Sequence, residues 1–70
     1  MMEKIRLNKE LFLYEDILQS IEVFSDICNF SVGNQGNYYL CYLKSSIYDE
    51  EETIKEFENY LSDLSNKKHY

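Results

Sequence analysis

The sequence predicts an α+β domain, a two-layer β-α-β-β-α sandwich, and three observations support this prediction. Apolar residues change from a period of two to a helical period and back again along the 70 residues. A Gly- and Asn-containing stretch at 33–37 separates two strand-like segments, and an acidic run at 49–52 precedes a second helical stripe. A chain of this length accommodates a single domain, residues 1–70, whose ends at 1–2 and 66–70 are expected to fray.

The first strand is predicted at residues 4–8, where polar and apolar side chains alternate. Ile5 and Leu7 point to the side that becomes buried. The opposite side carries Lys4, Arg6 and Asn8.

The two helices are predicted from apolar stripes at helical spacing. The first starts at about Tyr14 and ends near Asp26, with its stripe at Ile17, Leu18, Ile21, Phe24 and Cys28. The second has Ser46 or Asp49 as its N-cap, with its stripe at Ile54, Phe57, Leu61 and Leu64. Acidic residues in the first turns, such as Glu15 and Asp16, oppose the positive helix end and are expected to be solvated.

A β-hairpin is predicted from residues 28–32 and 38–44. With Gln35 and Gly36 as the loop, the helix-covered face comprises the pairs Val32–Tyr39, Phe30–Cys41 and Cys28–Leu43. The other face then carries Tyr38, Leu40 and Tyr42. A loop one residue longer would expose Tyr39, Cys41 and Leu43 instead, and the first register is favoured because its core is drier.

The order of these elements also predicts the sheet. A right-handed crossover and the hairpin place the longest strand in the middle, so the three-stranded, mostly antiparallel sheet has the order 1-3-2. Both helices cover one face, as in a ferredoxin-like sheet truncated by its fourth strand. The first strand is then an edge strand whose backbone groups are available to a partner.

No pattern in the sequence predicts catalysis, a cofactor or a metal, so an enzyme is not expected. His69 is the penultimate residue and has no predicted partner to make it a general base. Cys28 and Cys41 are diagonal in the favoured register, too far apart for easy bridging, and are interpreted as buried thiols rather than as a disulfide or metal ligands. The run 49–52 lacks the alternating ligands of a calcium loop and is interpreted as helix capping.

Charge and hydropathy restrict the partners and the location. The net charge of −6 argues against a general nucleic-acid binder. Neither a signal peptide nor an apolar run of membrane length is present, so a cytoplasmic protein without a membrane partner is expected. An RNA-binding module that stacks bases on Tyr38 and Tyr42 is a distant alternative.

The candidate partner-binding surface is the uncovered sheet face together with the edge of the first strand. Its residues are Lys4, Arg6, Tyr38, Leu40 and Tyr42. Tyrosine offers a large amphipathic contact area, and the two cations favour acidic side chains on an extended peptide. A protein or peptide partner is therefore predicted. Two alternatives are a homodimer formed through the same surface and tyrosines that only shield the sheet.

Short segments along about nine-tenths of the chain resemble the HxsD family. They are Ile5–Lys9, the "Phe-Ser-Asp" at 24–26, the strand Tyr38–Lys44 and the "Lys-Glu-Phe-x-Asn-x-Leu" at 55–61. The chain departs from the family in its last residues, 66–70, where the family has a basic tail. HxsD proteins are small proteins of the His-Xaa-Ser systems, found beside radical SAM maturases that act on a ribosomally made peptide. The resemblance implies an accessory role with a precursor peptide or a radical SAM enzyme as partner, and it supplies no catalytic residues.

Overall fold

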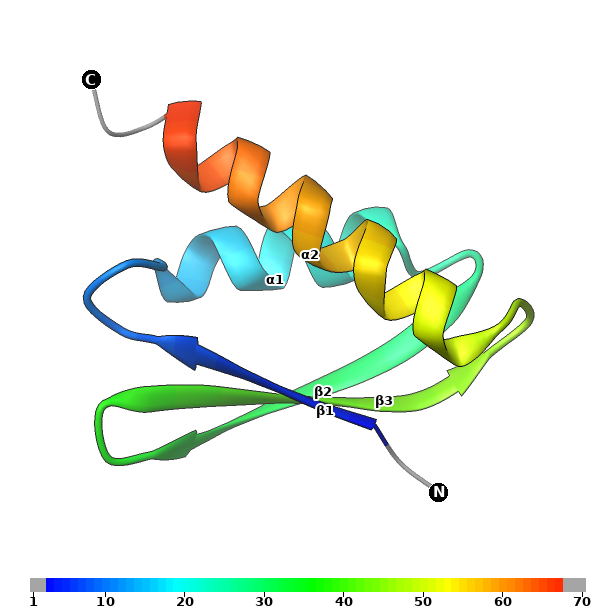
Figure 1. Cartoon of the computed structure of the whole chain (residues 1–70), viewed down its shortest axis with the longest axis horizontal. Coiled ribbons are helices and arrows are strands. Elements are labelled where there is room, and N and C mark those ends of the chain that lie inside the picture. The colour runs from blue at the N-terminus through cyan, green and yellow to red at the C-terminus, as the bar shows by residue number, and fades with distance from the viewer. Residues whose placement is uncertain (1–2, 68–70) are drawn as a thin grey trace.

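The computed structural model describes residues 3–67. Its elements are β1 (Glu3–Asn8), α1 (Tyr14–Val23), β2 (Cys28–Gln35), β3 (Tyr38–Ser46) and α2 (Glu50–Lys67). The strands form one antiparallel sheet in the order β1-β3-β2, and both helices lie on the same face of it (Figure 1). The predicted α+β class, element order and sheet order are confirmed. Of the ends expected to fray, 1–2 and 68–70 (with His69) lie outside the described residues, whereas Asn66 and Lys67 end α2.

The hydrophobic core lies between the sheet and the helices, and aromatic rings connect its layers. Phe57 of α2 is fully buried; its ring stacks on Phe30 of β2 at 4.1 Å and meets Phe24 edge-on at 5.5 Å. Such ring pairs add directional contacts to the burial of apolar area. The buried cluster is completed by Ile5, Leu7, Ile17, Cys28, Cys41, Leu43 and Leu61.

The hairpin register differs from the predicted one by two residues. The loop residues are Gly36 and Asn37 rather than Gln35 and Gly36, so Val32 lies opposite Cys41 and Phe30 opposite Leu43. Gly36 has a φ of +58° while Asn37 has a negative φ, which is the combination of a type II′ hairpin turn. Because side chains alternate with a period of two, this shift leaves every residue on its predicted face. The predicted pairs are therefore wrong, but the predicted faces are confirmed.

A β-bulge changes the pairing again near the end of the hairpin. Between the pairs Phe30–Leu43 and Asn29–Ser45, strand β3 contains one extra residue, Lys44. Cys28 consequently lies opposite Ser46 and not opposite Leu43. Beyond the bulge, the hydroxyl of Ser46 hydrogen-bonds that of Thr53 on α2 at 2.8 Å, and this bond joins the end of β3 to the start of α2.

Helix α1 is shorter than predicted, and one residue of its predicted stripe lies outside the core. Ile17 and Cys28 are buried and Ile21 and Phe24 pack against the core, as predicted, whereas Leu18 does not. The helix ends at Val23, because the carbonyl of Phe24 accepts the N–H groups of Ile27 and Cys28 in a turn that leads into β2. Leu18 is 43% exposed instead of part of the core, since it lies about 100° around the helix from the fully buried Ile17. Asp16 is only 1% exposed, so the expectation that it is solvated is wrong.

Helix α2 follows the sequence pattern closely. The carboxylate of Asp49 accepts the N–H of Glu52 at 3.2 Å, which confirms Asp49 as the N-cap. Phe57 and Leu61 are buried and Ile54 and Leu64 half-buried, as the predicted stripe requires. No helix in the described part of the chain is both long and apolar enough to cross a membrane.

Candidate binding surface

The five residues of the predicted surface share the uncovered face of the sheet. On β1 and β3, Lys4 lies opposite Tyr42 and Arg6 opposite Leu40. Tyr38 follows on the same face of β3, and the buried Ile5 and Leu7 of β1 point the other way, toward the helices. From this register, the sheet face that the helices leave uncovered carries two cations beside a row of two tyrosines and a leucine.

Arg6 and Tyr38 contact each other across the strands. The guanidinium carbon of Arg6 lies 5.2 Å from the centroid of the Tyr38 ring, within the range of a cation–π interaction. Both side chains remain exposed. This contact holds the guanidinium over the sheet while leaving its donors available to a carboxylate.

Leu40 lies at the centre of the uncovered face, yet it is only 6% exposed. Its neighbours on the two flanking strands are Arg6 and Gly33. A partner that docks on this face would meet Arg6, Tyr38 and Tyr42 before it met Leu40. We therefore interpret Leu40 as a packing residue under the surface, and Arg6, Tyr38 and Tyr42 as the residues that a partner would contact.

The outer edge of β1 has unpaired backbone groups at alternate residues. The N–H of Lys9 donates to the carbonyl of Asn37 at 2.9 Å, which continues the ladder with β3 and fixes its phase. Bonded pairs alternate with non-bonded pairs in an antiparallel ladder, so Ile5 and Leu7 bond to β3 and the backbone groups of Lys4 and Arg6 point outward. An extended segment added here would hydrogen-bond at the same two residues that carry the cations.

The part of the β1 edge that is open to a partner strand ends just beyond Arg6. The backbone carbonyl of Asn8 accepts the N–H groups of Leu11 and Phe12, and its side-chain oxygen accepts that of Glu10 at 2.8 Å. These bonds close a turn directly after β1, which limits the open edge to the middle of the strand. A short extended segment therefore fits this edge better than a long strand.

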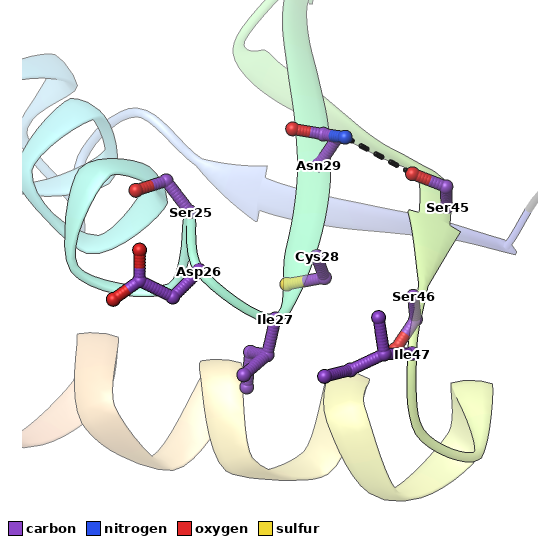
Figure 2. A pocket seen from close by; sticks show the side chains of 8 residues that line it. All are labelled: Ser25, Asp26, Ile27, Cys28, Asn29, Ser45, Ser46 and Ile47. Carbon is purple, nitrogen blue, oxygen red and sulfur yellow. Dashed lines mark hydrogen bonds between the residues drawn. The ribbon is translucent and has the colours of Figure 1, made fainter.

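The structure also forms a shallow pocket of about 170 Å³ at one end of the sheet (Figure 2). The turn after α1 contributes Ser25, Asp26 and Ile27, and the end of β3 contributes Ser45 and Ser46. Asn29 Nδ2 donates to Ser45 Oγ at 3.1 Å across the pocket. Because its polar side chains are largely exposed, this pocket lacks the enclosed, fixed polar groups that small-molecule sites use.

The cysteines lie apart, as the register requires. Cys41 is opposite Val32 and Cys28 opposite Ser46, so the predicted diagonal arrangement is wrong. Both are buried free thiols, as predicted, and burial raises the pKa of Cys28 and that of Cys41, the latter to about 11. Raised pKa values keep the thiols protonated and unreactive at neutral pH. Within residues 3–67, no group of three or more His, Cys, Asp or Glu side chains is arranged to hold a metal ion.

One exposed pair of apolar residues was not part of the predicted surface. Ile47 and Tyr48 form an apolar pair in the connection between β3 and α2. The sequence contained a signal for it, because these two residues belong neither to the alternation of the strand nor to the stripe of the helix. Apolar residues left outside both patterns are candidates for surface contacts.

Comparisons with known proteins gave no match to a protein-family model, to a curated protein or to a solved structure. The resemblance to the HxsD family therefore stays a prediction from the sequence.

Proposed function

We propose that the chain is a non-catalytic accessory protein of a ribosomal-peptide modification system. It binds a precursor peptide, or the radical SAM maturase that acts on it, through the uncovered sheet face and the β1 edge. This role places the protein in the cytoplasm. The resemblance to HxsD supplies the biological context, and the edge of β1 is the observation that carries the proposal.

The chemistry of the edge selects the kind of segment that binds. Residues directly opposite Lys4 and Arg6 on an added strand would place their side chains on the uncovered face, beside the two cations. Acidic residues at these two alternate positions would form ion pairs reinforced by main-chain hydrogen bonds. The residue between them would point to the helix side, next to Ile5 and Leu7, where an apolar side chain fits. The preferred segment therefore reads acidic, apolar, acidic.

A synthetic peptide with alternating glutamate and valine tests this proposal by fluorescence anisotropy. We expect the peptide to bind the native chain. Arg6→Glu should weaken this binding by about tenfold or more, because a desolvated ion pair becomes a like-charge contact. Lys4→Glu is expected to act in the same direction. Tyr42→Ala reports whether the tyrosine row contributes contact area.

The matched control is Lys55→Glu, which makes the same change in net charge at an exposed position of α2. If Lys55→Glu weakens binding as much as Arg6→Glu, the effect is one of net charge and the β1 edge is not the site. Equal binding of a lysine–valine peptide would exclude charge selection at this edge. Tight binding of single-stranded RNA that falls steeply with salt would instead favour the RNA-binding alternative.

Self-association through the same edge is the weaker candidate. Two β1 strands paired around a twofold axis would bring Lys4 and Arg6 of one copy against Arg6 and Lys4 of the other, all on one face. Like charges directly opposite each other destabilise a strand pair. The edge therefore favours an acidic partner over a second copy of the chain.

A further inference from the structure

Ile47 and Tyr48 are the start of a second, distinct surface at one end of the molecule. They are 69% and 62% exposed and lie in the connection between β3 and α2. Single exposed apolar residues are ordinary, but these two adjoin the half-buried Ile27 and two hollows in the surface. We call this set, with the acids Glu52 and Glu56 described below, the end patch.

The end patch is built on fixed backbone. The N–H of Ile47 donates to the carbonyl of Ile27 at 2.9 Å, and the N–H of Tyr48 donates to Ser46 Oγ at 3.2 Å. Asp49 then caps α2, so each residue of the connection is held by a hydrogen bond. A surface that is already ordered loses little conformational entropy when a partner binds.

Two hollows share Ile27 as a wall. Figure 2 shows the first, in which Ile27 and Ile47 lie next to each other on the side nearest α2. The second has a volume of about 110 Å³ and lies between Ile27, Tyr48 and three residues of α2, namely Glu52, Thr53 and Glu56. Its size is on the scale of a single apolar side chain rather than a folded surface.

The rim of the end patch is acidic. Glu52 and Glu56 line the second hollow and Asp26 lines the first, and all three are exposed. Asp49, Glu50 and Glu51 follow directly after Tyr48. Glu56 lies beyond the first turn of α2, so the positive helix end does not offset its charge. A concentration of one sign of charge around an apolar hollow attracts and orients a partner of the opposite sign.

We propose that the end patch docks a cationic segment of a partner protein, one aliphatic side chain flanked by Lys or Arg residues. The aliphatic side chain enters the hollow beside Tyr48 and Ile27, and the flanking cations meet Glu52 and Glu56. This proposal does not depend on the function proposed for the β1 edge, which has the opposite charge and selects acidic segments.

The test uses the ¹⁵N-labelled chain and a synthetic peptide with a central isoleucine between paired arginines. We expect amide shifts at Ile27, Tyr48 and Glu52. Tyr48→Ser is expected to weaken binding about tenfold, in line with the loss of one buried apolar contact, whereas Ile47→Ser, at a residue that lines only the first hollow, is expected to have a smaller effect. Glu52→Gln combined with Glu56→Gln should weaken binding further and reduce its dependence on salt.

Matched controls exist on the same molecule. Val23→Ser removes an exposed apolar side chain elsewhere, and Glu58→Gln removes an exposed charge of α2 that does not line the hollow. Both should bind like the native chain, and the amide spectrum of each variant reports whether it is folded. The proposal is overturned if the peptide with glycine in place of isoleucine binds equally well, or if the shifts fall outside the end patch. Full affinity in the double glutamine variant would also overturn it.

Discussion

At the scale of single residues, Leu40 combines a position on the uncovered face with the burial of a core residue. Leu40→Ala is expected to lower the free energy of unfolding by about 2 kcal/mol, because it removes a buried side chain and leaves a hollow. Leu18→Ala, which truncates a leucine that is 43% exposed, should have a smaller effect, about 1 kcal/mol or less. Urea denaturation of the two variants makes the comparison. Equal effects would mean that the Leu40 side chain is exposed to solvent rather than buried.

Cys41 predicts a dependence of stability on pH. Burial raises the pKa of this thiol from 9.0 to about 11. Between these pH values the unfolded chain releases the thiol proton while the folded chain keeps it, so the unfolded state binds fewer protons. The free energy of unfolding of the native chain therefore falls as pH rises through this range, and this contribution is fully present only below the lower value.

Cys41→Ala lacks this titration and makes the effect measurable. All other side chains are the same in both proteins, so the quantity to follow is the difference in stability between native chain and variant. We expect that difference to be constant below the ordinary thiol pKa and to shrink as pH rises above it. Parallel stability curves over the whole range would show that the thiol of Cys41 titrates normally in the folded chain.

At the scale of elements, the hairpin depends on one of the two glycines and not on the other. Gly36 has a positive φ, whereas Gly33 does not, and a β-carbon at Gly33 would meet no atom within 4 Å. Gly36→Ala should lower the free energy of unfolding by about 1 kcal/mol, because an L-residue is strained in that conformation. Gly33→Ala should change it by less than about 0.5 kcal/mol. Thermal denaturation distinguishes the two, and a larger effect at Gly33 would contradict the observed loop.

The same hairpin shows that the sequence could predict which residues are buried but not which residues pair. Alternation assigned Phe30, Cys41 and Leu43 to the covered face correctly, because burial depends on the period of two. The partner of each residue depends instead on which residues form the loop, and both Gly and Asn residues of the stretch 33–37 tolerate a positive φ. The bulge at Lys44 had no signal in the sequence, because the residues around it continue an ordinary strand pattern.

The two helices also differ in how well the sequence predicted their buried residues. The stripe of α2 was predicted mostly correctly, because Ile54, Phe57 and Leu61 do pack into or against the core. The helix also buries Thr53 and Ser65, which an apolar pattern does not include. In α1, Ile17 is flanked by Leu18 on one side and by the polar Asp16 and Ser20 on the other. The apolar pattern predicted that Leu18 would be buried. The structure buries Asp16 and Ser20 instead; the small Ser20 fits beside its neighbours while its hydroxyl donates to the carbonyl of Asp16 at 2.8 Å.

At the scale of the whole molecule, the two candidate surfaces carry opposite charges. The uncovered face and β1 edge present Lys4 and Arg6, and the end patch presents Glu52 and Glu56 within a chain of net charge −6. For the candidate surface, the sequence located all five residues on one face, but the outward direction of the β1 backbone required the ladder with β3. Together, the two proposals predict that one molecule binds an acidic and a cationic segment at once.

The charges of β1 also predict how copies of the molecule behave toward one another. Repulsion between Lys4 and Arg6 of two copies opposes edge-to-edge pairing, so the native chain should sediment as a monomer of 8.5 kDa. The variant with Lys4→Glu and Arg6→Glu should be monomeric for the same reason, with repelling acids instead.

Mixing the two proteins removes the repulsion, because each cation then faces a carboxylate across the paired strands. We expect the mixture, and neither protein alone, to form a dimer in analytical ultracentrifugation at low ionic strength, and salt to dissociate it. A mixture of native chain and Lys55→Glu serves as the control and should stay monomeric. A native homodimer that is unchanged in the double variant would show that copies meet elsewhere, and a mixture that stays monomeric would show that charge is not what keeps the β1 edge unpaired.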